Sequence, residues 1–151
     1  ALGASGDAVA RLLERRMEAF ARARALNPYD ATLTLTPAQE LAGRGFTEQA
    51  ETLLREGLSR TPLSSDLAVI LATLLEQRGE VGEAFNVLRP IDRLRPEAST
   101  KLTLARLSWH LGARDQAERY ALEALQLGNR SGALTALLRE MDSPLLEHIA
   151  P

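Results

Sequence analysis

The sequence predicts an all-α fold, a right-handed superhelix (an α-α solenoid) of antiparallel helix hairpins. Leucine and alanine supply 29 and 24 of the 151 residues, whereas aromatic residues make up only 4%, which favours packed helices over strands. Apolar residues recur at steps of three or four in one segment after another, as on the buried face of a helix. The breaks between these segments repeat every 33 or 34 residues, which is typical of stacked helix pairs.

The first helix is expected over residues 7–26, with Asp7 as its N-cap. Its apolar residues are spaced for one face of an amphipathic helix. Asn27 and Pro28 are expected to end it. The segment 7–28 is therefore predicted to be a lone helix, the second helix of an earlier hairpin. Its apolar residues are Val9, Leu12, Leu13, Met17, Phe20 and Ala23.

The second helix has the least defined beginning. Residues 31–36 alternate leucine with threonine, a pattern that also fits a short strand or an irregular turn. Thr36 followed by Pro37 is typical of an N-cap and the first helical residue. We therefore expect this helix over residues 37–44, shortened at its beginning.

Regular breaks divide the rest of the chain into six more predicted helices and a tail. Pro90 lies inside one of them and removes the backbone hydrogen bond to Asn86, so a kink or a helix end is expected there. The predicted helices are 47–60, 65–78, 81–94, 99–111, 115–127 and 131–141, and the tail 143–151 has room for one short turn.

Three sets of residues keep the same period along the chain. Glycine between two helices can adopt the positive φ that ends the first of them. A small alanine in the second helix lets the two helices approach closely, and a proline at the end forces a new start. These sets are Gly45, Gly79 and Gly112, then Ala50, Ala84 and Ala117, and then Pro28, Pro62 and Pro96.

These sets resemble the tetratricopeptide repeat (TPR), in which each unit of 34 residues is one helix hairpin. The resemblance implies a single domain over residues 1–151, with the C-terminal helix 131–142 as a cap. Pro37 departs from the pattern, because it replaces a core leucine, and other helical-hairpin repeats could mimic parts of it. The three repeats are 31–62, 65–96 and 98–129, and the middle one matches best.

Composition excludes several classes of function. A net charge of −2 gives no electrostatic case for nucleic acid as the main partner, and no apolar run approaches the ~20 residues that insertion into a membrane requires. There is no cysteine, and His110 and His148 are 38 residues apart. Motifs for zinc, calcium or phosphate are missing, so we expect no enzyme activity, no bound metal and no cofactor.

A stack of hairpins curves, and in the TPR family the concave groove, lined by the first helix of each hairpin, usually holds a peptide or a partner helix. First-helix residues that the core does not need are expected to face this groove. Our candidate partner-binding residues are Gln39, Val69, Thr73, Gln77, Leu102, Arg106, Trp109, His110 and Arg139.

Arg106 and Trp109 have alternative interpretations. Arginine and tryptophan together are typical of a binding hot spot, and Arg139 follows Arg106 by one repeat, so the two arginines could bind carboxylates of a ligand. Alternatively, Arg106 pairs with a neighbouring glutamate, and Trp109 fills the core against Tyr120. The carboxylate clamp of some family members is not expected here, because apolar residues such as Val69 and Leu102 replace its polar side chains.

The sequence therefore predicts a non-catalytic scaffold or adaptor that binds a peptide or an amphipathic helix of another protein, within a bacterial assembly or secretion-type complex. Alternatives are a recruitment domain cut from a larger enzyme, such as a glycosyltransferase, and a module that assembles with copies of itself. Arginine outnumbers lysine 17 to 1, which hints at a GC-rich bacterial genome. Bacterial cytoplasm and periplasm both remain open.

Overall fold

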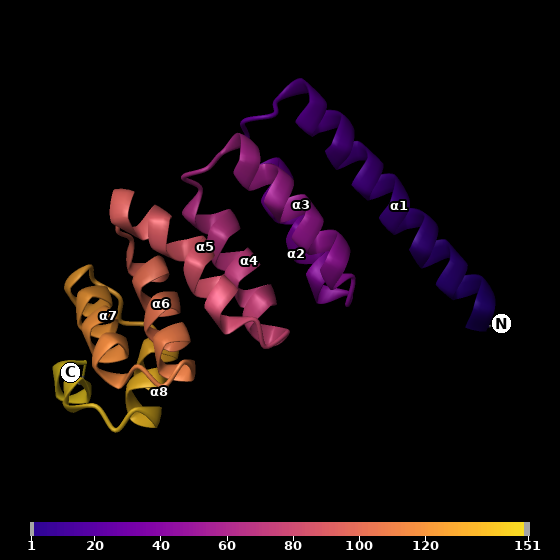
Figure 1. Ribbon diagram of the computed structural model, residues 1–151. Coiled ribbons are helices and arrows are strands. Elements are labelled where there is room, and N and C mark those ends of the chain that lie inside the picture. Colours follow the sequence, from indigo (N-terminus) through magenta and orange to yellow (C-terminus); the bar gives the residue numbers. More distant parts are fainter. Residues whose placement is uncertain (1, 150–151) are drawn as a thin grey trace. The chain divides into compact units, whose positions relative to one another are not determined.

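The computed structural model describes residues 2–149, which fold into α-helices joined by short loops (Figure 1). The chain forms two compact units, Ala1–Pro62 and Leu63–Pro151. The predicted all-α class and the order of sequential hairpins are confirmed. The first unit contains α1 (Leu2–Leu26), α2 (Thr32–Gly43) and α3 (Thr47–Arg60). The second contains α4 (Ser65–Gln77), α5 (Val81–Leu94), α6 (Ala98–His110), α7 (Arg114–Gln126), α8 (Gly132–Glu140) and the 3₁₀ turn η1 (Pro144–His148).

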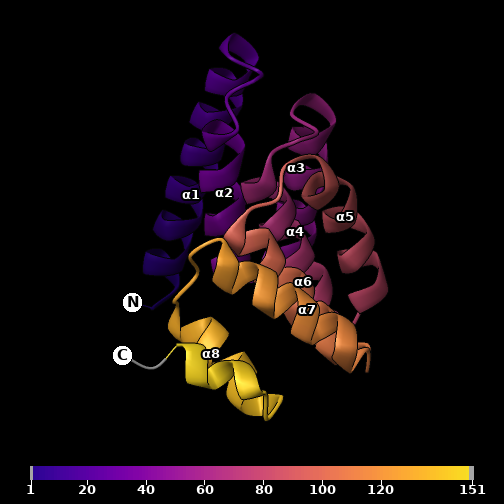
Figure 2. The same cartoon turned by 90° about the vertical axis from the view of Figure 1, so that its left-hand side faces the viewer.

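Glycines end the first helix of each hairpin, as predicted. At Gly79 the backbone has φ +83°, and the following amide of Glu80 donates back to the Leu75 carbonyl at 2.8 Å. Gly45 and Gly112 have φ values of +87° and +76°. A residue with a β-carbon rarely adopts such values, so each glycine lets the chain reverse into the second helix. The reversal brings α6 and α7 side by side (Figures 1 and 2).

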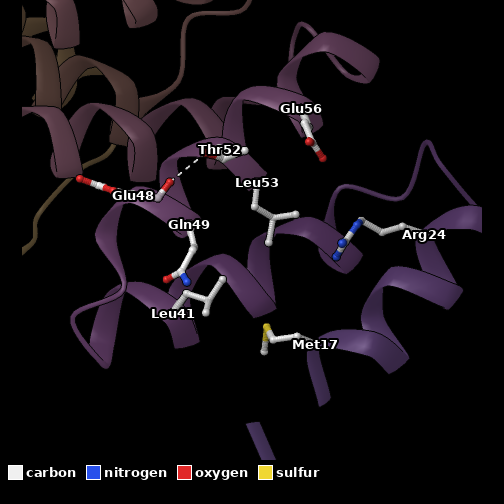
Figure 3. Close-up of a pocket in the computed structure, with 8 residues that line it drawn as sticks. All are labelled: Met17, Arg24, Leu41, Glu48, Gln49, Thr52, Leu53 and Glu56. Carbon is white, nitrogen blue, oxygen red and sulfur yellow. Dashed lines mark hydrogen bonds between the residues drawn. The ribbon is translucent and has the colours of Figure 1, made fainter. Parts of the chain in front are cut away.

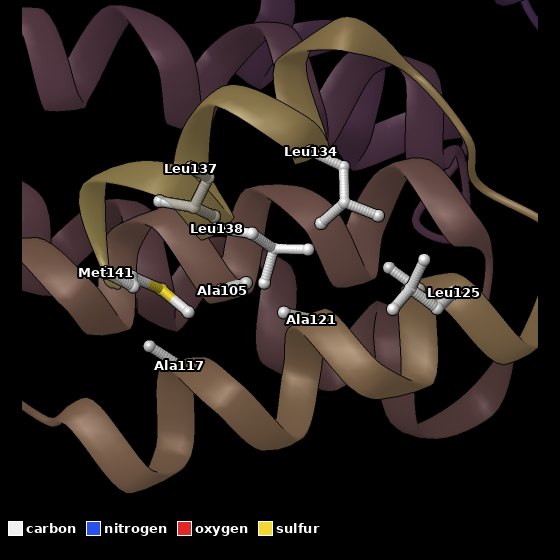
Figure 4. Packing of buried hydrophobic residues seen from close by; sticks show 9 residues of the cluster. Ala105, Ala117, Ala121, Leu125, Leu134, Leu137, Leu138 and Met141 are labelled. Carbon is white, nitrogen blue, oxygen red and sulfur yellow. The ribbon is translucent and has the colours of Figure 1, made fainter. Parts of the chain in front are cut away.

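Small residues allow the helices to pack closely. Ala50, Ala84 and Ala117, the predicted alanine set, are all fully buried. In the second unit the last three helices share one apolar cluster (Figure 4). In it α8 contributes large side chains that pack against alanines of α6 and α7. The cluster consists of Ala105, Ala117, Ala121, Ala124, Leu125, Leu134, Leu137, Leu138 and Met141.

The predicted start of α2 at Pro37 is wrong, because the helix begins at Thr32 and contains Pro37 in its interior. Asp30 accepts a hydrogen bond from the Thr32 amide at 2.9 Å and so starts the helix earlier. Pro37 has no amide hydrogen for the carbonyl of Leu33, four residues before it. The guanidinium of Arg24, on α1, donates to that carbonyl at 3.1 Å. A side chain from the neighbouring helix thus replaces the hydrogen bond that proline removes.

The predicted start of α1 also needs correction, and one of the two outcomes expected for Pro90, a helix end, does not occur. Asp7 is not an N-cap, because α1 begins at Leu2; nothing in the Gly- and Ala-containing stretch before Asp7 forbids helix. Pro90 does not end α5, which continues to Leu94. Both Pro90 and Asn86 are exposed, so water can solvate the Asn86 carbonyl that proline leaves without its donor. The predicted bounds of α3 and α5 are correct, and the grouping of all helices into one repeat domain stays a prediction.

A buried charge network joins α5, α6 and α7. Lys101, the only lysine of the sequence, donates to Asp92 at 2.8 Å, pairs with Glu123 and lies 5.2 Å from the ring centre of Tyr120. Burial alone lowers the pKa of Lys101, but its hydrogen bonds and ion pairs with Asp92 and Glu123 outweigh burial, so the pKa is raised. The ammonium therefore stays charged inside the packed helices and fixes their contact.

Candidate functional site

The predicted site residues of the second unit lie on α4, α6 and α8, the first helices of their pairs and the cap. Leu102 and Trp109 are half-buried and pack against the apolar cluster of α6, α7 and α8. Val69 and Thr73 of α4 are also half-buried, and the Thr73 hydroxyl donates to the Val69 carbonyl at 2.9 Å. These four side chains therefore contribute to packing and leave only part of their surface for a partner.

Arg106 and His110 converge on one carboxylate, that of Glu76. Arg106 Nε lies 3.0 and 2.9 Å from the two Glu76 oxygens, and its terminal nitrogen lies 2.7 Å from Oε2. His110 Nδ1 lies 2.8 Å from Glu76 Oε1. The Glu76 side chain is only 12% exposed, whereas that of Arg106 is 33% exposed. The carboxylate thus holds two cationic or polar side chains of α6 against α4 in a fixed geometry.

A glutamate of α8 fixes the orientation of Trp109, as Glu76 of α4 does for Arg106. Its indole N–H donates to Glu140 at 3.0 Å, while its ring packs against the apolar cluster. Tyr120, the partner expected for Trp109, packs against the same cluster and makes an edge-to-face contact with Phe85. Glu76 thus links α4 to α6 through Arg106 and His110, and Glu140 links α8 to α6 through Trp109. We name these five residues the α4–α6–α8 strip.

The remaining predicted residues are exposed. Gln77 lies at the end of α4 and Arg139 near the end of α8, and Arg139 forms no salt bridge within the described part of the chain. Gln39 lies on α2 in the first unit. The structure shows the alternative expected for Arg106, a pair with a neighbouring glutamate, and the glutamate is Glu76. The hydrogen bond of Trp109 to Glu140 was not predicted, although a spacing of about one repeat suggests contact between equivalent faces of neighbouring hairpins.

The described residues contain neither a cluster of metal-binding side chains nor a membrane-spanning helix. Among residues 2–149, no group of three or more histidine, aspartate or glutamate side chains could hold a metal ion. No helix in that range combines the length and the hydrophobicity needed to span a bilayer. The strip offers hydrogen-bond donors, acceptors and one indole ring, which are groups suited to recognition.

The comparisons with known proteins agree with this fold. The sequence matches no family model and no curated protein. Among solved structures it is similar to TTC0263, a thermophilic TPR protein of Thermus thermophilus, with 26% identity over 93% of this chain and 79% of that chain and a TM-score of 0.67. It is also similar to YrrB, described as a TPR protein with an unusual peptide-binding site, with 17% identity, 88% and 70% coverage and a TM-score of 0.66.

A third similar structure is that of MamA, with 13% identity over 91% of this chain and 82% of that chain and a TM-score of 0.67. TPR folds generally serve protein–protein interaction. The hairpin order, the glycine turns and these neighbours together show that the chain has a TPR-like fold, shared with bacterial TPR proteins.

Proposed function

We propose that the chain is a non-catalytic scaffold or adaptor and that its second unit binds a polypeptide segment of a partner along the α4–α6–α8 strip. The segment is a peptide or an amphipathic helix. The setting we propose is a bacterial assembly or secretion-type complex, by analogy with the uses of this fold. The observation that carries the proposal is the fixed orientation of Arg106 and Trp109 on one surface.

Fixed side chains favour binding for an entropic reason. Immobilising a long side chain at an interface costs about 0.5–1.5 kcal/mol, and Glu76 and Glu140 already restrict Arg106 and Trp109 in the free protein. Arginine and tryptophan are also the residues most enriched at the energetic centres of interfaces. A partner that contacts both would therefore lose little freedom in the side chains that it meets.

The strip and two further residues of the same helices, Leu102 of α6 and Arg139 of α8, indicate the kind of segment that fits. Leu102 and the exposed part of Trp109 offer apolar surface. The guanidinium of Arg106 is already neutralised by Glu76, whereas Arg139 lacks a salt bridge within the described residues and can donate hydrogen bonds to a carboxylate of the partner. A segment with one or two apolar anchors followed by an acidic residue matches this surface.

The test compares partner capture by the full chain and by variants in its native organism. The double variant Arg106→Ala/Trp109→Ala is expected to recover partners at least about tenfold less than the wild type. Its matched control is Arg119→Ala/Tyr29→Ala, which removes an exposed arginine and an exposed tyrosine away from the strip.

A second variant guards against misfolding of the first. Arg139 is exposed, so Arg139→Glu leaves the core intact and is expected to weaken capture by reversing the charge offered to the partner. Circular dichroism should show full helicity for every variant. Equal partner recovery by wild type, by the double variant and by Arg139→Glu contradicts the proposal.

A further inference from the structure

The first unit contains a hollow that the proposed function does not use. It lies among α1, α2 and α3, has a volume of about 560 Å³ and is floored by Met17, Leu41 and Leu53. Figure 3 shows these three side chains directed toward one another, one from each helix. Each of them is half-buried, so the floor is apolar surface that packing within the unit leaves partly uncovered.

A second hollow continues the first along α1. Its volume is about 380 Å³, it shares Met17 and Leu41 with the first, and it adds Leu13 and Phe46. Phe46 is one of only three phenylalanines in the sequence, and 44% of it is exposed to solvent. This large apolar side chain therefore adds uncovered apolar surface to the hollow. From Ala10 to Arg24 the lined part of α1 spans roughly 21 Å, since an α-helix rises about 1.5 Å per residue. We name the two hollows together the α1–α3 groove.

The rim of the groove is acidic. Glu14 and Glu18 line it from α1, and Glu48 and Glu56 line it from α3. Within the described part of the chain, Glu14, Glu18 and Glu48 form no salt bridge. Four carboxylates therefore surround an apolar floor and attract positive charge.

Arg24, the cation among the described residues that line the groove, offsets only part of this charge. Arg24 lines the groove, but its guanidinium donates to the Leu33 carbonyl at 3.1 Å. It interacts electrostatically with Glu56, and Arg60 lies close enough to act on it as well. One guanidinium thus stands against four carboxylates among the residues that line the two hollows, so the net charge of this lining is negative.

We propose that the α1–α3 groove binds an amphipathic helix of a partner protein whose apolar ridge is flanked by lysine or arginine. An apolar groove of this length accepts a helix through anchors spaced three, four and seven residues apart. Basic side chains beside the ridge would meet the carboxylates of the rim, which gives both the orientation and the specificity of docking. The groove belongs to a different unit from the α4–α6–α8 strip, so this proposal does not depend on the proposed function.

The test uses two synthetic helical peptides of about 18 residues, five helical turns, that share the same leucine positions. One carries lysine at all other positions and the other carries glutamate. Binding to the full chain is measured by titration calorimetry and located by NMR chemical shifts. We expect the Leu/Lys peptide to bind and to shift the resonances of α1 and α3, and the Leu/Glu peptide to bind at least about tenfold more weakly.

Variants separate the groove from general charge attraction. Glu18→Lys/Glu56→Lys is expected to weaken binding of the Leu/Lys peptide at least about tenfold. Its matched control, Asp7→Lys/Glu147→Lys, changes the net charge equally at exposed positions outside the groove and is expected to keep the affinity within about twofold. Thr52 is exposed and lines the groove, so Thr52→Trp fills the hollow without changing any charge and is expected to block binding.

Several results overturn the proposal. They are equal binding of both peptides, absence of binding, shifts confined to the second unit, or an equal loss of affinity in the matched control. A dimer in sedimentation that must dissociate before the peptide binds would assign the groove to a second copy of the chain. Arg106→Ala/Trp109→Ala should leave peptide binding unchanged, so the proposed function and this inference can fail separately.

Discussion

Arg24 and Pro37 are expected to depend on each other energetically. Pro37 lies inside α2 without an amide hydrogen, and Arg24 donates to the orphaned Leu33 carbonyl at 3.1 Å. Arg24→Leu removes this donor and leaves the carbonyl without a partner. Pro37→Ala restores a backbone N–H at the position from which a helix normally donates to Leu33.

The magnitude follows from the kind of hydrogen bond. A hydrogen bond from a charged donor contributes about 1.5–3 kcal/mol, and this one is partly buried, so Arg24→Leu should lower the free energy of unfolding by that amount in the wild type. In the Pro37→Ala background the carbonyl regains its backbone donor, and the same change should cost less than about 0.5 kcal/mol. The difference, about 1–2.5 kcal/mol, is the coupling energy of the double-mutant cycle.

The assay is urea unfolding followed by far-UV circular dichroism, with hydrogen exchange of the α1 and α2 amides to assign the effect to the first unit. Trp109 lies in the second unit. The urea transition followed by its fluorescence should therefore differ little between the Arg24→Leu variant and the wild type. Arg22→Leu is the matched control, because Arg22 is an exposed arginine of the same helix. An equal cost of Arg24→Leu in both backgrounds, within about 0.3 kcal/mol, refutes the reasoning.

Three further outcomes are expected. Lys101→Met leaves the Asp92 carboxylate buried and unpaired, and should lower the free energy of unfolding by about 3–5 kcal/mol in urea titrations; adding Asp92→Leu should recover most of it. Because the folded pKa of Lys101 is raised, its contribution should persist up to pH 10.5 and be lost only as the pH rises further through the folded pKa, measured by thermal unfolding across alkaline pH. Gly79→Ala should destabilise the folded protein by about 1–2 kcal/mol, because Gly79 has a positive φ. Gly82 lies inside α5 with open space around it, so Gly82→Ala should stabilise the folded protein by about 0.5–1 kcal/mol. Thermal denaturation of both variants checks the two signs.

The hairpin architecture could be predicted because its signals are local. A glycine such as Gly79 ends a helix by its own backbone conformation, and an alanine such as Ala84 is required wherever two helices meet closely. Both kinds of residue keep their spacing along the chain, so the period is visible without knowledge of any contact between distant residues.

The beginning of α2 could not be predicted in the same way. Thr36 and Pro37 have the local pattern of a helix start, and the pattern is misleading because a guanidinium from another helix serves the Leu33 carbonyl. The start of α1 was missed because Asp7 is a good N-cap residue that the structure does not use as one.

The candidate sites depend still more on contacts between helices. The periodicity was sufficient to place Arg106 and Trp109 on first-helix faces, but their partners Glu76 and Glu140 lie 30 and 31 residues away. The α1–α3 groove was not predicted, because its acidic rim is formed by glutamates of two helices that a sequence pattern assigns to ordinary solvated faces.

The burial of Lys101 has a practical consequence for measuring motion in the second unit. Since the sequence contains a single lysine and its ammonium is held between Asp92 and Glu123, its side-chain amine is shielded from acylating reagents while α5, α6 and α7 stay packed. The rate of acylation at this one position therefore reports how often that contact opens, and a ligand that clamps these helices should slow the reaction.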